Sequence, residues 1–330
     1  MLIEHQHPDN KSMMVALLGA PNAGKSSLIN ALLGTDLSAV TPKPQTTRNR
    51  FNCVMTIDHT EIVMVDTPGL HRSSVEFNKR LNEQAREGSE GADLNLLLVD
   101  LRKEVFKQLQ DFNETILRHL SETWLVFTKA DLVEDSDKLP LDEIFEKARE
   151  LIPALTKHFV ISSKTGHNIH ELTGALCDHA LPGPHFYEDG SISNKNERFF
   201  VTEYIREQAF LLLKDELPYE LAVIIDEYRD LKEGEFAKSD NPKIRSHISA
   251  SILVNRPSQR AIVVGSKGAM IKDIGTRARA RIEELLGGQV HLNLHVKVSP
   301  RWFKNNFVLE EIGLPRAHDS HRVWRSKNGK

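Results

Sequence analysis

The sequence contains only two cysteines, Cys53 and Cys177, among 330 residues. Two thiols cannot build the disulfide framework of a small secreted domain or a four-thiolate zinc site, so the composition fits a reducing cytosol. The chain also lacks an apolar run near the roughly 18 residues that a membrane-spanning helix needs. Met1 to Lys11 contain neither an apolar core nor a cleavage-site pattern, so we expect no secretory signal. These absences favour a cytoplasmic protein.

The chain has almost no excess charge of either sign. It carries 43 Lys and Arg against 46 Asp and Glu, a net charge of -3, which for the whole chain argues against a nucleic-acid-binding protein. Hydrophobic residues make up 40% and charged residues 27%, the composition of a folded globular protein. The length exceeds what one compact domain usually needs, so we expect two domains.

Short apolar runs alternate with amphipathic stretches from Met13 to about Leu181, the pattern of a parallel sheet wrapped by helices. The predicted buried strands are Met13–Leu18, Glu61–Val65, Leu94–Val99, Trp124–Phe127 and Phe159–Ile161. Arg50–Ile57 alternates polar and apolar residues, which predicts an edge strand joined by a hairpin to the next strand.

A polar stretch with two prolines and two glycines, PGPHFYEDGSISNKNE, interrupts this pattern and predicts a linker. After it we predict helices at Arg198–Lys214 and Ala269–Leu286 and strands at Glu220–Glu227, Lys243–Val254, Ala261–Val264 and His291–Val298. The predicted organisation is a flexible N-terminus at 1–12, a nucleotide-binding domain at 13–182, a linker at 183–197, a second domain at 198–315 and a basic tail at 316–330.

A phosphate-binding loop follows the first predicted strand. Gly19–Ser26 fits the pattern G-x-x-x-x-G-K-[ST], and the next residues predict a helix that ends at Gly34. Backbone N–H groups of such a loop converge on phosphate oxygens at a helix N-terminus, where Lys25 supplies charge and the Ser26 hydroxyl can bind magnesium. The predicted contacts are Gly19, Ala20, Pro21, Asn22, Ala23, Gly24, Lys25, Ser26 and Ser27.

Two further segments are expected at the terminal phosphate. Asp66 ends the next strand, where its carboxylate can hold magnesium, and Thr67, Pro68 and Gly69 follow it. Gly69 can offer its N–H to the phosphate in a flexible switch segment. The polar segment Pro42–Arg50 resembles a first switch, and either Thr46 or Thr47 reaches magnesium, with Thr47 favoured. The magnesium ligands we expect are therefore Ser26, Thr47 and Asp66.

Two segments at later strand ends are predicted to recognise the nucleotide base. They are Thr128-Lys129-Ala130-Asp131 and Ser162-Ser163-Lys164. They resemble the [NT]KxD and S-A-K guanine elements of small GTPases. A carboxylate at Asp131 accepts both N–H groups of the guanine edge, and adenine has the opposite pattern, so adenine is rejected. Thr128 stands where asparagine is usual and Ser163 where alanine is usual, and we expect selectivity to survive.

Hydrolysis is expected to be slow. Ras-like GTPases have a glutamine directly after D-x-x-G, and here Leu70 holds that position and cannot orient a water. Our catalytic candidates are Lys25, Thr47 and Gly69. Asn22 matches an asparagine that helps to bind potassium in some related GTPases, or else it only stabilises the loop. The expected cofactors are GTP and Mg²⁺, with K⁺ as an open alternative.

The second half contains a different signature. Gly265-Ser-Lys-Gly268 follows an apolar run and precedes a helix, and a G-x-x-G loop lets a nucleic-acid backbone approach closely. Between Arg256 and Lys304 the chain has ten Lys or Arg against three Asp or Glu, a local balance of +7. The combination favours a surface that binds single-stranded RNA over a basic helix face that is merely solvated. The predicted RNA contacts are Arg256, Arg260, Gly265, Ser266, Lys267, Gly268, Lys272 and Arg277.

Taken together, GAPNAGKSSLINALLG, PQTTRNR, DTPGL, ERFFVTEYIREQAF, ELPY and VVGSKGAMIKDIG resemble the Era GTPases of bacteria and organelles, from roughly Met13 to Pro315. The resemblance implies an α/β P-loop GTPase domain, with a mostly parallel sheet flanked by helices, followed by an α+β type II KH domain. It implies slow GTP hydrolysis and a KH domain on the 3′ end of 16S ribosomal RNA. It further implies a role in assembly of the 30S ribosomal subunit, and some family members associate peripherally with the inner membrane. We expect a monomer.

Two alternatives remain open from the sequence. One is an RNA-binding structural assembly protein whose GTPase is vestigial, although Lys25, Ser26, Asp66 and Asp131 are all present. The other is a tRNA-modifying or tandem-domain GTPase, which shares the TTR and DTPG motifs but lacks the C-terminal G-x-x-G block. A single-turnover GTPase assay decides the first, and binding to a single-stranded ribosomal oligonucleotide decides the second.

Overall fold

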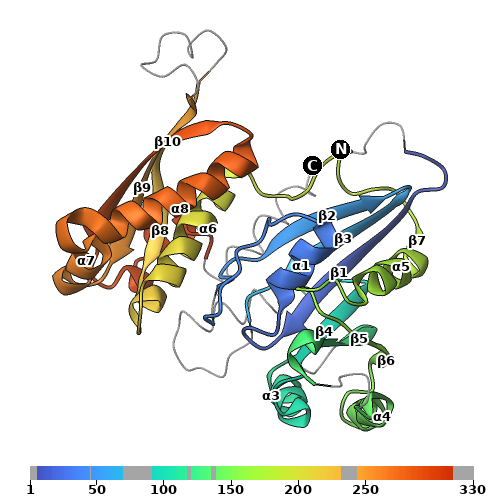
Figure 1. The fold of residues 1–330 in the computed structure, drawn as a ribbon. Coiled ribbons are helices and arrows are strands. Elements are labelled where there is room, and N and C mark those ends of the chain that lie inside the picture. Colours follow the sequence, from blue (N-terminus) through green and yellow to red (C-terminus); the bar gives the residue numbers. More distant parts are fainter. Residues whose placement is uncertain are drawn as a thin grey trace. The chain divides into compact units, whose positions relative to one another are not determined.

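The structure is a computed structural model that describes residues 6–44, 46–69, 91–116, 120–134, 139–231 and 244–314. The chain divides into two compact units (Figure 1). The first comprises Met1–Ser38 and Thr47–Asn194, and the second comprises Ala39–Thr46 and Lys195–Lys330. Among the described residues, no helix combines the length and the apolar character required to cross a membrane.

The first unit is built on a mostly parallel sheet with the strand order β2-β3-β1-β4-β5-β6. Its strands are β1 (Lys11–Gly19), β2 (Phe51–Ile57), β3 (Thr60–Asp66), β4 (Leu94–Asp100), β5 (Thr123–Thr128) and β6 (Leu155–Val160). β2 and β3 form the predicted antiparallel hairpin, and the short β7 (Leu181–Pro182) pairs with β1. The central strands β4 and β5 are buried throughout, as their continuous apolar character predicted.

Helices cover both faces of this sheet. They are α1 (Lys25–Leu33), α3 (Val105–Ile116), α4 (Leu141–Leu151) and α5 (Ile169–His179). Side chains alternate between the two faces of a strand. On β5, Trp124 packs its ring against His179 of α5, with centroids 5.1 Å apart, whereas Leu125 and Phe127 join the core formed with α3 and α4. α5 therefore lies on the opposite face from α3 and α4.

Two strands of the first unit, β1 and β6, begin two or more residues earlier than predicted. β1 begins at Lys11, inside the predicted flexible N-terminus, because Lys11 and Ser12 pair with both β3 and β7. β6 begins four residues earlier than predicted and ends at Val160. Among the described strands, β6 lies at the edge of the sheet and pairs with β5 alone. Its polar residues Thr156 and Lys157 are exposed, and the apolar pattern that predicted a buried strand is missing there.

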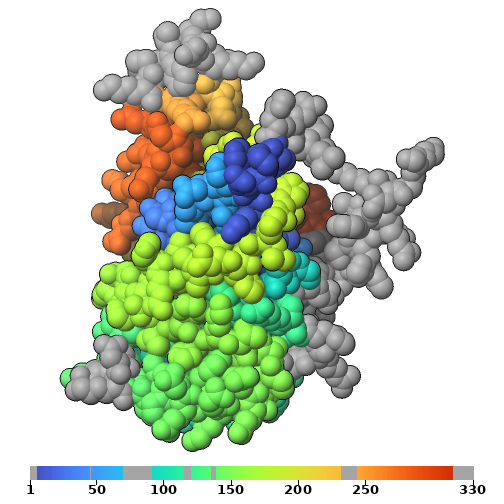
Figure 2. Space-filling view, turned by 90° about the vertical axis from the view of Figure 1, so that its right-hand side faces the viewer, coloured from blue at the N-terminus to red at the C-terminus, as the bar shows by residue number. Residues whose placement is uncertain are grey.

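Much of the predicted linker, residues 183–194, lies along the edge of the first sheet. The N–H of Val54 on β2 donates to the Ile192 carbonyl at 3.0 Å. Glu61 of β3, 1% exposed, accepts the N–H groups of Phe186 at 2.6 Å and Tyr187 at 3.2 Å. Figure 2 shows this yellow-green segment beside the dark blue N-terminal residues, where Gln6 accepts a hydrogen bond from the chain at 185. The segment is thus held to the first unit by specific bonds.

The second unit has a three-stranded sheet with the order β10-β9-β8. Its elements are α6 (Glu197–Leu212), β8 (Ala222–Asp230), β9 (Ile244–Val254), α7 (Pro257–Val264), α8 (Ala269–Leu286), β10 (Gln289–Val298) and α9 (Asn306–Glu311). β9 pairs parallel with β10 and antiparallel with β8, and α6 and α8 pack together on the sheet (Figure 1). On β10, Leu292, Leu294, Val296 and Val298 share the less exposed face, as the strict alternation of the sequence predicts, and the buried Val290 extends that face.

Two predicted strands of this unit need correction. Ala261–Val264 is not a strand but the last turn of α7. Pro257 at the first helical position and the capping interaction between Arg256 and Gln259 start this helix, and a four-residue apolar run alone cannot distinguish helix from strand. β8 spans Ala222–Asp230 rather than Glu220–Glu227, because Leu217–Glu220 forms a 3₁₀ turn.

Candidate guanine-nucleotide site and nucleic-acid groove

Four of the segments predicted to bind nucleotide lie at the carboxyl ends of parallel strands, at one edge of the first sheet, while Thr46 and Thr47 lie between α1 and β2. The four segments are the phosphate loop after β1, Asp66–Gly69 after β3, Thr128–Asp131 after β5 and Ser162–Lys164 after β6. Because this edge collects the loops of neighbouring strands, residues more than a hundred positions apart come together there.

Lys25, at the start of α1, is 6% exposed. Its ammonium donates to the carbonyls of Gly19 at 3.0 Å and Ala20 at 3.1 Å, both in the phosphate loop. Burial lowers the pKa of Lys25 to about 8, and the nearby negative charge of Asp66 acts in the opposite direction. A buried cation already directed at this loop is suited to receive the negative charge of a phosphate.

Three oxygens from three segments meet beside this lysine. The Ser26 hydroxyl lies 2.9 Å from the Thr47 hydroxyl and 3.1 Å from a carboxylate oxygen of Asp66. Two hydroxyls and a carboxylate are the hard oxygen ligands that Mg²⁺ prefers, so the residues present fit this ion. Thr46 is directed elsewhere, because its hydroxyl lies 2.6 Å from that of Thr41 and donates to the Lys43 carbonyl at 2.8 Å.

The residues after Asp66 pack closely against the phosphate loop and its strand. The buried Thr67 hydroxyl donates to the Leu17 carbonyl of β1 at 2.5 Å. At Gly69 an added Cβ would lie 2.8 Å from Cα of Pro21, so only glycine permits this approach. Leu70, which supported the expectation of slow hydrolysis, lies outside the described residues.

The guanine segment is tied to the phosphate loop by Thr128. Its hydroxyl donates to the Ala23 carbonyl at 2.7 Å and also lies 3.2 Å from the Val99 carbonyl. Although Thr128 stands where asparagine is usual, it therefore still bonds the base-binding turn to the phosphate loop. The Ser162 hydroxyl donates to the Asp131 carboxylate at 2.7 Å, which orients the group expected to meet the guanine edge.

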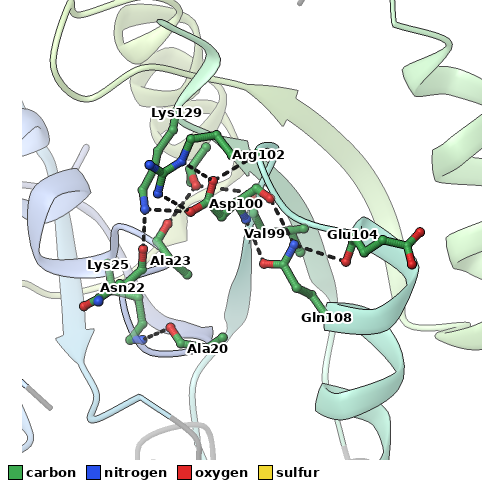
Figure 3. Close-up of polar contacts among 11 residues, drawn as sticks. Ala20, Asn22, Ala23, Lys25, Val99, Asp100, Arg102, Glu104, Gln108 and Lys129 are labelled. Atoms are coloured by element: carbon green, nitrogen blue, oxygen red, sulfur yellow. Dashed lines mark hydrogen bonds and ion pairs between the residues drawn. The ribbon is translucent and has the colours of Figure 1, made fainter. Parts of the chain in front are cut away.

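The sequence analysis missed Asp100, a buried carboxylate at the end of β4. Arg102 and Lys129 both donate to it, and Lys129 also reaches the phosphate loop (Figure 3). Burial alone would raise the pKa of Asp100, but the hydrogen bonds from Arg102 and Lys129 outweigh burial and hold the pKa well below its usual range. Its position could have identified it, since β4 lies between the strands that carry the phosphate loop and the guanine segment.

In the second unit, a cavity of about 350 Å³ opens between α8 and β10, beside the G-x-x-G loop. Its apolar lining includes Ile271, Leu292 and Leu294, and its basic lining is Lys272 and Arg279. Apolar walls with flanking cations suit unstacked bases attached to phosphates. We call this cavity the α8–β10 groove.

The predicted RNA residues fall into groups around this groove. Lys272 lines it, while Arg256, Arg260, Ser266 and Lys267 are exposed at α7 and the loop. Arg277 instead pairs with Asp273 of its own helix at 2.9 Å. Arg279, Leu292 and Leu294 also line the groove but were not among the predicted RNA contacts, although the basic helix and the alternating strand placed them on adjoining faces.

The segment Ala39–Thr46 belongs to the second unit, where it contacts α6, another feature that the sequence did not indicate. The Val40 N–H donates to the Glu207 carboxylate of α6 at 2.8 Å. The Lys43 ammonium donates to the carbonyls of Phe210 and Leu213 at the end of the same helix. Burial lowers the pKa of Lys43, and the charge of Asp215 acts against this shift.

Two different families of known proteins match the two halves of the chain. Residues 14–129 match the model of the 50S ribosome-binding GTPase family, and residues 216–303 match the KH domain family. The GTPase Era of Syntrophus aciditrophicus is 35% identical over 306 residues, which cover 92% of this chain and 95% of the relative. The GTPase Era of Leuconostoc citreum is 35% identical over 305 residues, covering 92% and 96%.

Solved structures agree with these sequence matches. A crystal structure of Era in complex with MgGDPNP and nucleotides 1506–1542 of 16S ribosomal RNA superimposes with a TM-score of 0.83 at 31% identity. A variant of Aquifex aeolicus Era bound to GDP and AlF₄⁻ gives a TM-score of 0.83 at 30% identity. Each comparison covers 93% of this chain and 100% of the other. The match extends through both units.

Proposed function

This chain belongs to the Era family of GTPases, and from that premise we propose that it hydrolyses GTP, binds 16S ribosomal RNA through its KH domain and assists assembly of the 30S subunit. The observation that carries the proposal is that one chain holds both a phosphate loop beside gathered hydroxyl and carboxylate oxygens and a basic-flanked groove beside G-x-x-G. A nucleotide enzyme alone would not need the groove, and an RNA-binding module alone would not need the gathered oxygens.

At the nucleotide site we assign roles from the geometry. Ser26, Thr47 and Asp66 would hold magnesium, which when bound neutralises charge developing on the phosphates. Lys25 and the loop N–H groups bind the phosphates, and Gly69 can offer its N–H to the terminal one. Asp131, oriented by Ser162, selects guanine. Thr46 has no part in this proposal, because its hydroxyl bonds within the segment that contacts α6.

Slow turnover remains a prediction, as does a role for potassium at Asn22. Asn22 has a left-handed backbone with φ of 61°, and its carbonyl accepts a hydrogen bond from Lys129 at 2.5 Å. If Asn22 also binds K⁺, single-turnover hydrolysis should be faster in potassium chloride than in sodium chloride of the same ionic strength. Equal rates in the two salts would leave Asn22 with only its role in the loop.

At the RNA site, the α8–β10 groove supports recognition of single strands. Bases can stack on the apolar lining of Ile271, Leu292 and Leu294, and phosphates can meet Lys272 and Arg279 at the rim. The +7 balance between Arg256 and Lys304 supplies the long-range attraction that the net charge of the whole chain concealed.

Single-turnover release of phosphate from GTP, with magnesium and excess protein, tests the enzymatic half. Hydrolysis that is slow but clearly faster than in a Lys25→Ala protein supports the proposal. A protein that binds GTP tightly and releases no phosphate above background would instead favour the alternative of an RNA-binding structural protein with a vestigial GTPase.

Cross-linking followed by sequencing of the bound RNA tests the other half. The paired variants are Lys272→Ala and Arg279→Ala, in the groove, with Arg149→Ala on α4 as the matched control. We expect 3′-terminal 16S sequences for the parent chain and the control and a strong loss for the groove variants. If the bound RNA is not ribosomal, the assembly proposal fails while the RNA groove stands.

We also propose an oligomeric state, a ribosomal partner and a location for the protein. We expect a monomer that sediments with 30S subunits and associates at most peripherally with the inner membrane. Light scattering, co-sedimentation with purified subunits and flotation with liposomes of bacterial lipid test these three expectations separately.

A further inference from the structure

A continuous chain of polar contacts runs from an exposed arginine to the phosphate loop (Figure 3). Arg102 donates to Asp100 through Nε at 3.0 Å, Nη2 at 2.8 Å and its backbone N–H at 3.1 Å. Asp100 accepts the Lys129 ammonium at 2.7 Å, and the same ammonium donates to the Asn22 carbonyl at 2.5 Å. Four residues therefore link the end of β4 to the loop that would surround the phosphates.

The backbone of Asp100 is fixed independently by Gln108 of α3. The Asp100 N–H donates to the Gln108 side-chain oxygen at 3.0 Å, and the Gln108 side-chain nitrogen donates to the Asp100 carbonyl at 2.9 Å. With both backbone groups held, the carboxylate position depends on its two cations. Arg102 binds it through a planar fork, which restrains both oxygens at once, as a lysine could not.

We propose that Arg102 is a positioning residue for nucleotide retention: through Asp100 it holds the Lys129 ammonium on the Asn22 carbonyl of the phosphate loop. This rests on the proposed function, since it concerns the same nucleotide site. Lys129 has a left-handed backbone, with φ of 63°, at the turn that carries Asp131. A loosened Lys129 would therefore loosen both the loop around the phosphates and the turn that recognises the base.

A second hydrogen bond joins the guanine segment to the phosphate loop and limits the expected effect of losing Arg102. The Thr128 hydroxyl also bonds the phosphate loop, at Ala23. Loss of Arg102 should thus weaken retention without abolishing binding, and guanine selectivity should persist because Asp131 and Ser162 remain bonded to each other. Hydrolysis at saturating GTP should persist as well, since Lys25 keeps its bonds to the phosphate loop and Thr47 and Asp66 keep theirs to Ser26.

The main variant is Arg102→Ala, whose side chain is 43% exposed in the parent, so its removal opens no buried cavity. Arg102→Lys keeps the charge but loses the fork, and Asp100→Asn removes the carboxylate while keeping the volume. The matched control is Arg149→Ala, since Arg149 is 49% exposed and pairs with Glu146 on its own helix. Release of fluorescent GDP by the full chain is measured in stopped flow, together with KM and kcat for GTP and the melting temperature without nucleotide.

We expect Arg102→Ala to release GDP about tenfold faster, Arg102→Lys to fall between it and the parent, and Arg149→Ala to match the parent. KM should rise while kcat stays within about twofold, and Asp100→Asn should release GDP at least as fast as Arg102→Ala. Equal release rates for parent and Arg102→Ala would overturn the proposal. A lower kcat and a lower melting temperature of Arg102→Ala with an unchanged rate of GDP release would also overturn the proposal. If the parent chain binds no GDP, the proposed function itself fails.

Discussion

The backbone N–H of Val40 donates a hydrogen bond of 2.8 Å to the carboxylate of Glu207, which is 2% exposed on α6. The other oxygen of this carboxylate accepts Arg281 of α8 at 2.5 Å. The segment that contains Val40 ends at Thr46, and the next residue, Thr47, is bonded to Ser26 in the nucleotide site. One buried carboxylate thus joins the segment that leads into the magnesium ligands to the helix that lines the RNA groove.

Glu207→Gln tests whether the two sites communicate through this carboxylate. The amide keeps an acceptor for the Val40 N–H but removes the charge that binds Arg281, so the link to α8 weakens. We expect the ratio of RNA dissociation constants measured with GDP and with a non-hydrolysable GTP analogue to move toward one by about threefold or more. Fluorescence anisotropy with a 3′-terminal 16S oligonucleotide measures both constants.

Glu197→Gln on the same helix is the matched control, because Glu197 bonds Tyr228 and Arg245 rather than the Ala39–Thr46 segment. It should leave the ratio unchanged. If Glu207→Gln behaves like this control, Glu207 carries no coupling, and if the parent ratio is already one, no coupling exists to be lost.

The sequence predicted the fold class well because its strongest signals are local. The phosphate loop, DTPG and G-x-x-G each combine a short motif with a flanking strand or helix, and the glycines end α1 and α8 where expected. The errors occurred where local signals are weak. The polar edge strand β6 lacks an apolar pattern, and the run Ala261–Val264 is too short to separate helix from strand.

The missing site residues depend on long-range packing, which a single sequence does not reveal. Asp100 stands 29 positions from Lys129, and Val40 stands 167 positions from Glu207. Both contacts follow from which strands and helices become neighbours. The choice between Thr46 and Thr47 was likewise open in the sequence, because adjacent residues differ only in the direction that the backbone gives each hydroxyl.

Thr47→Ala should impair magnesium-dependent hydrolysis, and Thr46→Ala should not. The Thr47 hydroxyl lies 2.9 Å from Ser26, whereas the Thr46 hydroxyl bonds Thr41 and the Lys43 carbonyl. We expect Thr47→Ala to raise the magnesium concentration for half-maximal hydrolysis about tenfold or more, and Thr47→Ser to restore most of the loss. A magnesium titration of single-turnover hydrolysis measures this. A larger shift for Thr46→Ala than for Thr47→Ala would reverse our assignment.

The two glycines of the G-x-x-G loop should respond differently to substitution. Gly265 has φ of 72°, and an added Cβ would lie 2.7 Å from Cβ of Met270, whereas Gly268 has φ of 81° with open space around it. Gly265→Ala should cost about 2 to 4 kcal/mol of unfolding free energy and Gly268→Ala about 1 to 2 kcal/mol. Urea denaturation measures both.

Gly268→Ala is therefore the cleaner test of RNA binding. Its added methyl group enters the open space through which a nucleic-acid backbone would approach, while the fold is largely kept. We expect weaker RNA binding with normal GDP binding. RNA affinity equal to that of the parent would mean that the backbone does not approach the loop at Gly268.

Nucleotide affinity should fall as the pH rises through about 8, because burial lowers the pKa of Lys25 to about 8 from the ordinary 10.5 in the protein without nucleotide. Phosphate oxygens stabilise the ammonium, so the pKa of Lys25 rises when nucleotide binds. Above about pH 8 the free protein has lost this proton and must regain it, which opposes binding. The dissociation constant of GDP should increase by up to about tenfold per pH unit above about pH 8 and should change little below it.

The same shift predicts the stability of the nucleotide-free protein. Between about pH 8 and 10.5 the unfolded chain holds more of this proton than the folded chain, so the Lys25 contribution to the unfolding free energy increases with pH in that window. GDP titrations from about pH 6.5 to about 9, with calorimetry in two buffers of different ionisation enthalpy, separate proton uptake from other effects. RNA binding by the same protein without nucleotide is the internal control, since Lys25 and the groove belong to different units. A GDP dissociation constant that stays flat to about pH 9, with no proton uptake, would place the pKa of Lys25 near its ordinary value and remove the argument that burial prepares this lysine for phosphate.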